Sequence, residues 1–340
     1  MTVARIPRPD PAPEGAGILA SLIGQHRFHD ALEAYFALGD EHRADPSAQC
    51  WAATAAARLG RFAPATILAK EAKQGFEAHG SASDRMRVLN LLGALALETG
   101  HLAEAEQLFR EALTCRGAME DRILRAHATS NLASIMDLRA STDTALRLYY
   151  EALRLYQDAE DTRGIAQTYH NLNIVFRSQS MLEAAESVAR LAVKNAGVHG
   201  APALVALCLA GQAETRVARE DFEGARQCLV AARMRSEESA DECCMAEVHR
   251  VAADFHLKNG EPDQAIAEAE IARSMASRSG ATLIAAEASA VSSIGFKTTG
   301  RRQEAAERRK EAVQAFQRME AEWLQQYYAR AWDNAGTAGQ

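Results

Sequence analysis

Hydrophobic and polar positions along the chain alternate with the period of an α-helix, and this helical pattern itself recurs every 40 residues. Alanine stands at the same point of seven successive units: Ala65, Ala105, Ala145, Ala185, Ala225, Ala265 and Ala305. A second column follows seven residues later: Ala72, Ala112, Ala152, Ala192, Ala232, Ala272 and Ala312. A fixed period of this length indicates a repeat protein whose units stack on one another.

Each 40-residue unit is predicted to form a helical hairpin. In one unit, apolar residues fall at helical spacing in two runs: Leu124, Ala128, Leu132, Ile135 and Leu138, then Ala145, Leu148, Tyr149, Ala152 and Leu155. The expected turn residues precede the first alanine column by five positions: Gly60, Gly100, Ala140, Ser180, Glu220, Gly260 and Gly300. This phase predicts second helices beginning near residues 62, 102, 142, 182, 222, 262 and 302, with alanines buried where paired helices approach most closely. A shorter, diverged copy lies upstream, around Phe28 and Ala31.

The unit from Arg87 to Leu113 resembles the tetratricopeptide repeat. The matching residues are Leu92 and Gly93 in the first helix, Gly100 at the turn, and Ala105, Phe109 and Ala112 in the second helix. The usual aromatic near the start of the first helix and the closing proline are mostly absent. The 40-residue length is similar to the long-repeat branch of kinesin light chains, spindle-orientation adaptors and bacterial peptide-sensing or sugar-sensing regulators. The resemblance implies an all-α, right-handed superhelical solenoid of about seven to eight helix-turn-helix repeats, with the first helices lining the concave face.

Both ends of the chain depart from the repeat. Residues 1–16 are proline-rich and are predicted to be a disordered leader, residues 17–320 form the solenoid, and residues 321–340 form a capping helix and tail. The last segment concentrates apolar side chains: Trp323, Leu324, Tyr327, Tyr328 and Trp332. Two interpretations stay open, a helix that caps the last repeat and a surface through which the protein forms a homo-oligomer.

The composition narrows the classes of function. The net charge is −7, and the densest basic run is interleaved with glutamates, which argues against a nucleic-acid partner. The longest apolar run, from Ala203 to Ala210, is too short to cross a membrane. Six cysteines without paired spacing favour reduced thiols in a cytoplasmic protein.

The sequence carries no catalytic, cofactor-binding or metal-binding motif. Phosphate-binding glycine loops, nucleophile elbows and H-E-x-x-H are all absent. His249 and His256 share a predicted helix, but no third ligand accompanies them. The adjacent Cys243 and Cys244 are interpreted as two half-buried small residues. We therefore expect no enzyme, no cofactor and no metal site.

The concave face of such a solenoid is the expected binding surface for a peptide or a partner helix. The repeat phase projects these polar residues onto it: Arg87, Asn90, His127, Ser130, Asn131, Ser134, Gln167, His170, Asn171, Arg177, Arg250, Asp254 and Lys258.

Two asparagines one repeat apart, Asn131 and Asn171, each precede a leucine on this face. In the tetratricopeptide repeat family that this chain resembles, the asparagine of this pair hydrogen-bonds the main chain of a bound peptide, because its amide offers a donor and an acceptor. The alternative is an asparagine that only bridges neighbouring helices. Arg87, Arg177 and Arg250 add positive charge, so we expect the bound segment to be acidic or to end in a carboxylate.

These observations favour a non-catalytic adaptor that holds a segment of a partner protein in its concave groove. The alternative is a peptide-sensing or ligand-sensing regulatory module that acts on a separate output protein. A compact, enclosed groove would favour the sensor, and an open groove would favour the adaptor.

Overall fold

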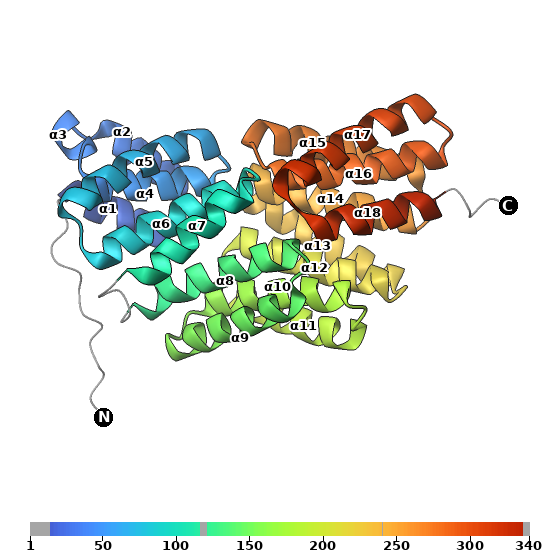
Figure 1. Cartoon of the computed structure of the whole chain (residues 1–340), viewed down its shortest axis with the longest axis horizontal. Coiled ribbons are helices and arrows are strands. Elements are labelled where there is room, and N and C mark those ends of the chain that lie inside the picture. The colour runs from blue at the N-terminus through green and yellow to red at the C-terminus, as the bar shows by residue number, and fades with distance from the viewer. Residues whose placement is uncertain (1–13, 116–120, 240, 336–340) are drawn as a thin grey trace.

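The computed structural model describes residues 14–115, 121–239 and 241–335, and within these ranges it contains eighteen α-helices and no strand. An N-terminal group comprises α1 (Glu14–Gly24), α2 (Phe28–Ala37) and the single turn α3 (Asp40–Arg43). Seven hairpins follow, whose first helices are α4 (Pro46–Arg58), α6 (Ala82–Glu98), α8 (Arg122–Leu138), α10 (Thr162–Ser178), α12 (Pro202–Ala218), α14 (Glu242–Lys258) and α16 (Thr282–Thr298). Their second helices are α5 (Phe62–His79), α7 (Leu102–Thr114), α9 (Thr142–Asp158), α11 (Leu182–His199), α13 (Phe222–Ser239), α15 (Pro262–Ser279) and α17 (Arg302–Met319). The helical solenoid ends with α18 (Glu322–Asn334), which confirms the expected fold class (Figure 1).

The 40-residue phase holds through all seven hairpins. Their second helices begin at the seven residue numbers that the alanine columns predict. Ala105, Ala145, Ala185 and Ala225 are each 0% exposed, which confirms their predicted burial. A methyl side chain lets the axes of paired helices come close, and larger side chains fill the space beside it.

Gly93, the glycine of the motif that resembles the tetratricopeptide repeat, is also required by the close approach of two paired helices. A Cβ atom added to Gly93 on α6 would lie 2.6 Å from the ring of Phe109 on α7. Phe109 is fully buried and cannot retreat into solvent. The pair therefore fixes how closely these two helices pack.

A repeated C-terminal cap ends each first helix. In the first full hairpin, the backbone N–H of Arg61 donates to Ala56 O at 2.9 Å and that of Gly60 donates to Ala57 O at 3.1 Å. This Schellman pattern requires a left-handed residue, and Gly60 has φ +69°. Ala140 and Glu220 hold the same role at φ +56° and +63° despite their side chains. Hairpin packing therefore imposes the turn even where the residue disfavours it.

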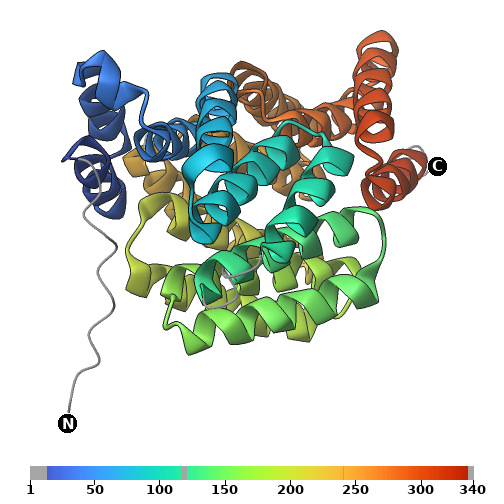
Figure 2. The ribbon, with the colours of Figure 1, turned by 60° about the vertical axis from the view of Figure 1, so that its left-hand side comes forward.

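The solenoid coils far enough for its early and late hairpins to touch. Figures 1 and 2 show the N-terminal hairpins beside α14–α18. Thr282 donates its hydroxyl to Thr99 O at 3.1 Å, and Arg139 pairs with Glu320 at 3.1 Å. Leu102 at the start of α7 shares a core cluster with Met319. Nothing in the repeat pattern predicts this closure.

The ends of the solenoid differ in how far the structure describes them. Helix α1 begins at Glu14, inside the segment assigned to the leader, and residues 1–13 and 336–340 lie outside the described ranges. At the other end, α18 buries Leu324 and Tyr328 against the last hairpin. The Tyr328 ring stacks on Phe316 with centroids 5.6 Å apart. This contact is the one expected of a cap.

Replacing Ala185 by leucine should destabilise the fold by roughly 1 to 3 kcal/mol, because the added carbons overpack the closest approach of α10 and α11. Chemical denaturation measures the change. The control is Ala267→Leu, which adds the same side chain at an exposed position on α15 and should be nearly neutral. Equal effects of the two changes would contradict the packing role of the column.

Deleting residues 321–340 should lower the melting temperature, because it exposes Phe316 and Met319. The oligomeric state measured by light scattering should stay the same. Trp323→Ala is the matched test of the oligomer interpretation, because Trp323 remains partly exposed and stacks on Tyr327 at 5.4 Å. A dimer in the intact protein that this change dissociates would show that α18 is an interface.

Candidate ligand-binding face

Consecutive first helices touch one another along the solenoid and form its inner layer. The Asn90 side chain on α6 donates to Leu124 O on α8 at 2.9 Å, and Asn173 on α10 donates to Thr215 Oγ1 on α12 at 2.5 Å. Buried amides thus bridge neighbouring first helices at these two points. Bridging of neighbouring helices was the structural alternative for Asn131 and Asn171. The asparagines that form such bridges are Asn90 and Asn173 instead.

Three of the residues predicted to face a ligand are buried. Asn90 and Ser130 are each 6% exposed and Arg250 is 5% exposed. These residues lie on first helices, as the repeat phase predicts, and contacts with adjacent helices cover their side chains. Asn90, Ser130 and Arg250 are thus little exposed on the inner face, and their contact with a ligand stays a prediction.

A network of ion pairs occupies the part of the inner face formed by α10, α12, α14 and α16. Arg250 pairs with Glu247 at 2.6 Å, with Glu214 at 3.0 Å and with Glu287 at 3.9 Å. Arg177 pairs with Glu214 at 2.9 Å. The carboxylates of this network outnumber its guanidinium groups.

The pKa values of two glutamates in this network shift in opposite directions. Burial alone would raise the pKa of Glu214, but the charges of Arg177 and Arg250 outweigh it and lower the pKa to about 2. Burial raises the pKa of Glu287 to about 7, and repulsion by Glu247 and Glu214 adds to the rise against the attraction of Arg250. Glu214 therefore stabilises the network as an anion, whereas Glu287 carries its charge there at a cost.

The C-terminal helix and local partners complete this paired region. Lys258 pairs with Asp254 at 3.0 Å and donates to the hydroxyl of Tyr327 at 3.3 Å. Tyr328 donates to Glu287 at 3.4 Å.

Arg87 also has a partner, pairing with Asp84 at 3.1 Å while its guanidinium lies 5.2 Å from the Trp51 ring centroid. All three arginines on which we based the expectation of an acidic ligand, Arg87, Arg177 and Arg250, are thus already neutralised within the protein. These three arginines therefore no longer support the expectation that the bound segment is acidic or ends in a carboxylate.

The remaining predicted residues on α8 and α10 form an unpaired band. Within the described ranges, the following side chains are partly exposed and make no hydrogen bond or ion pair: His127, Asn131, Gln167, His170 and Asn171. Ser134 does not belong to this band, because its hydroxyl bonds that of Tyr149 at 2.9 Å. The band presents two carboxamides at equivalent positions, one on each helix, together with a third at Gln167.

The two histidines of the unpaired band are held in their neutral forms. Burial, and then the charge of Arg163, lowers the pKa of His127 to about 4, and its ring packs 5.6 Å from that of Tyr156. Burial also lowers the pKa of His170. A Cβ atom on Gly211 would lie 2.8 Å from His170 Nδ1, so α12 approaches this ring closely.

Two arginines that the sequence analysis did not select belong to the same region. Arg163 precedes Gln167 by four residues on α10, and Arg58 lies in the last turn of α4. Neither guanidinium has a carboxylate oxygen within 4.0 Å among the described residues. Arg163 could have been found from the sequence, because it continues the stripe of Gln167 and Asn171 by one turn.

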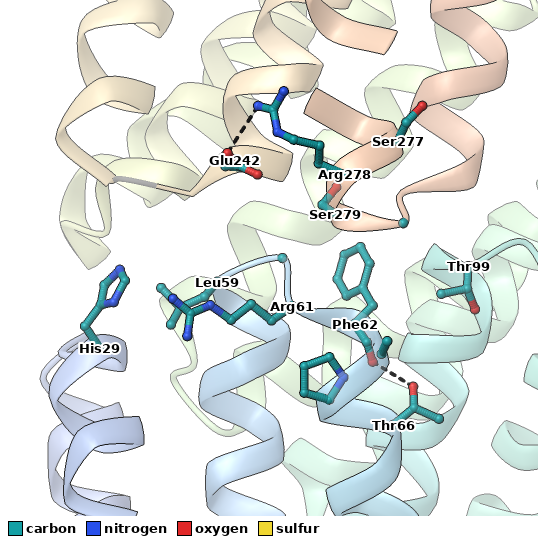
Figure 3. Close-up of a pocket in the computed structure, with 14 residues that line it drawn as sticks. His29, Leu59, Arg61, Phe62, Thr66, Thr99, Glu242, Ser277, Arg278 and Ser279 are labelled. Atoms are coloured by element: carbon teal, nitrogen blue, oxygen red, sulfur yellow. Dashed lines mark hydrogen bonds and ion pairs between the residues drawn. The ribbon is translucent and has the colours of Figure 1, made fainter. Parts of the chain in front are cut away.

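A separate cleft of about 650 Å³ lies where the early and late hairpins meet. Figure 3 shows one wall formed by α2 and the α4–α5 turn and the other by α14 and α15, with Arg278 bonded to Glu242 at 3.2 Å. Phe62 points into the cleft toward the end of α15. None of the predicted site residues lines it.

The described residues show neither a group of three potential metal ligands nor a helix long and apolar enough to span a bilayer. His249 and His256 each pair with a glutamate, Glu268 at 2.5 Å and Glu261 at 2.6 Å. At the start of α14, Cys243 is partly exposed, as interpreted from the sequence, whereas Cys244 is fully buried.

Comparison with known proteins identifies the fold. No family model and no curated protein matches this chain. Among solved structures, the Rap conjugation gene regulator of the plasmid pLS20 in complex with the Phr* peptide has a TM-score of 0.67 at 13% identity, covering 93% of this chain and 96% of that chain. A Rap protein complexed with Competence and Sporulation Factor has a TM-score of 0.63 at 13% identity, covering 95% and 96%. The apo form of RapI has a TM-score of 0.57 at 13% identity, covering 80% and 97%. The chain therefore has the fold of a helical-repeat solenoid of the tetratricopeptide type.

Glu214→Gln and Glu287→Gln should change stability in opposite directions at pH 8. The first change removes the negative charge that Arg177 and Arg250 share, and it should lower the free energy of unfolding by roughly 3 kcal/mol. The second removes an anion whose raised pKa costs stability as the pH rises from about 4.5 to about 7. It should be neutral or stabilising at pH 8 and should flatten the pH dependence across that window. Urea denaturation at pH 5 and pH 8 measures both, and equal losses would contradict the assignment.

Proposed function

We propose that this chain is a non-catalytic, peptide-binding regulatory module whose inner face holds a short extended peptide. The unpaired amides of Asn131 and Asn171 carry this proposal. They stand at equivalent positions of neighbouring first helices, and each offers a donor and an acceptor that nothing in the described protein uses. Two such groups one repeat apart can hold the main chain of a peptide at two points.

The solved structures with the same fold support this proposal. Two of them, matched over more than nine-tenths of both chains, are complexes, one with the Phr* peptide and one with Competence and Sporulation Factor. Because identity is 13% in both cases, the likeness supports a shared mode of binding and leaves the ligand of this chain to be found by experiment.

Enclosure of the inner face favours a sensor of short peptides over an adaptor for long segments. Thr282 meets Thr99 across the seam between early and late hairpins, and Tyr327 and Tyr328 on α18 reach side chains of α14 and α16. A long chain would have to thread past these contacts, whereas a short peptide needs only their transient opening. We infer that binding is read out by a separate protein partner rather than by nucleic acid or membrane.

The cysteines support a cytoplasmic setting for this module. All six are free thiols, and burial raises the pKa of Cys50 and Cys208 to about 12. Thiols this poorly ionised are unreactive and suit a reducing compartment.

Replacing both Asn131 and Asn171 by alanine should weaken peptide binding by about ten-fold to a hundred-fold, since each amide contact contributes about 1 kcal/mol. The probe is a pentapeptide library with free termini, screened by affinity selection and mass spectrometry. Calorimetry with the best-retained member then compares wild type with the double variant.

The control for this experiment is Asn195→Ala on the outer helix α11, where the side chain bonds only Leu191 O of its own helix. Melting temperatures should be similar for all three proteins. Unchanged affinity in the double variant, with the fold intact, would show that the peptide lies elsewhere.

A further inference from the structure

We propose that the cavity beneath the C-terminal helix α18 is a second binding site, which takes a small aromatic carboxylate. The cavity has a volume of about 260 Å³ and lies between α16, α17 and α18. Figure 1 shows these three helices side by side at the C-terminal end of the solenoid. None of the residues predicted to bind a peptide lines the cavity, so this site is separate from the unpaired band of the inner face.

Aromatic side chains form much of the cavity wall. Phe316 on α17 and Tyr328 on α18 are buried, and their rings stack with centroids 5.6 Å apart and an interplanar angle of 7°. Trp332, one turn further along α18, is partly exposed and completes this wall. Aromatic walls favour a flat apolar ligand, because rings gain from stacked and edge-to-face contacts beyond the burial of their area.

The volume of the cavity limits the ligand to one or two rings. An apolar cavity of about 150 Å³ can hold a benzene molecule. The cavity beneath α18 is larger, at about 260 Å³, and therefore has room for a single or fused ring with a short substituent.

Arg309 supplies a cation at the edge of this cavity. Its guanidinium carbon lies 4.5 Å from the centroid of the Trp332 ring. Among the described residues, no carboxylate lies within 4.0 Å of its nitrogen atoms, and no hydrogen bond uses them. A guanidinium presents a planar fork of donors that matches a carboxylate, so Arg309 can hold the acidic group of a ligand whose ring lies in the cavity.

Arg309 is an exception within the basic run of α17. Its neighbour Arg308 pairs with Glu270 at 2.7 Å, as a salt-bridged surface requires. A helix places the residues three and four positions away beside a given side chain. For Arg309 these positions are all apolar: Ala305, Ala306, Ala312 and Val313. The interleaved glutamates of the run therefore do not account for this arginine.

The charge of the site favours a monoanion. Lys297 also lies against Trp332, with its ammonium nitrogen 4.8 Å from the ring centroid, but it donates to Trp332 O. One guanidinium without a partner and one ammonium that is already used balance a single negative charge. A carboxylate carries that charge, whereas a phosphate monoester approaches two charges at neutral pH.

The surroundings of the cavity favour a free small molecule over a protein partner. On α18, polar or charged exposed residues flank those that line the cavity: Glu322, Gln326, Arg330 and Asp333. A protein interface generally needs a broader apolar patch. Residues 336–340 contain no aromatic or long aliphatic side chain that could fill the cavity from within the chain.

A ligand in this cavity would hold α18 against the last hairpin. Gln325 donates to Phe316 O at 3.3 Å, and Tyr328 donates to Glu287 at 3.4 Å, so both ends of the wall already join α18 to its neighbours. A ligand that contacts α17 and α18 together binds only the packed form of α18 and stabilises it by mass action. We expect the melting temperature to rise with ligand concentration.

The test measures the binding of phenylacetate and indole-3-acetate to the full chain by calorimetry and thermal melts, each beside its amide. Wild type should bind each acid at least about ten-fold more tightly than the amide, as expected for charge-assisted hydrogen bonds. Arg309→Gln should remove this preference. The matched control is Arg302→Gln, which changes another exposed arginine of α17 that has no ion pair and does not line the cavity, and it should keep the preference.

A second variant tests the cavity itself. Ala329 lines the cavity from an exposed position on α18, so Ala329→Phe should block the binding of both acids while the unliganded protein still folds.

Three results with the probes would overturn the site: binding of neither acid by wild type, equal affinity for acids and amides, or a preference for the acids that persists in Arg309→Gln. Undiminished binding in Ala329→Phe would show that the acids bind elsewhere and would also overturn it. Peptide binding at Asn131 and Asn171 is judged separately, because neither residue lines this cavity.

Discussion

The close approach of paired helices at the alanine column is the constraint on which the rest of the structure depends. Residues such as Ala145 and Ala185 have no exposed surface, so each hairpin has nearly the same thickness and the same turn. Identical units stacked at a fixed rotation generate a superhelix, and the pitch of that superhelix decides whether distant hairpins meet. Here they meet, since Thr282 bonds the carbonyl of Thr99 and Arg139 bonds Glu320.

The hairpins were predictable from sequence because the forces that form them are local and repeat seven times. A single unit could be misread, but the phase of seven fixes every helix start, including turns where Ala140, Ser180 and Glu220 replace glycine in a left-handed conformation. Closure of the superhelix was not predictable in this way. It depends on small rotations accumulated over about 180 residues, and the contacts at the seam, such as Leu102 with Met319, occur once and leave no periodic signal.

The same distinction applies to the candidate site, where positions set by the repeat register were predictable and contacts that occur only once were not. The repeat phase brought Asn131 and Asn171 onto equivalent positions, since this depends only on register. It could not tell that Arg250 is enclosed by glutamates from α12, α14 and α16. One signal for that network was present and unused. Glu247 and Glu287 are 40 residues apart, so two like charges had to stack on adjacent helices and required a cation nearby.

The inner face therefore combines two regions with different physical roles. Around Arg250, every charge is used internally, and such a network holds the first helices in one relative arrangement at the cost of desolvating its members. Around Asn131 and Arg163, polar groups stay without partners although they are partly buried, which is unfavourable in the absence of a ligand. A ligand that forms hydrogen bonds with those groups removes this cost. Helix α10 belongs to both regions, because it carries Asn171 of the unpaired band and Arg177 of the ion-pair network. Helix α18 contacts that network through Tyr328, which donates to Glu287, so a shift of the first helices relative to one another would alter how α18 packs against the last hairpin.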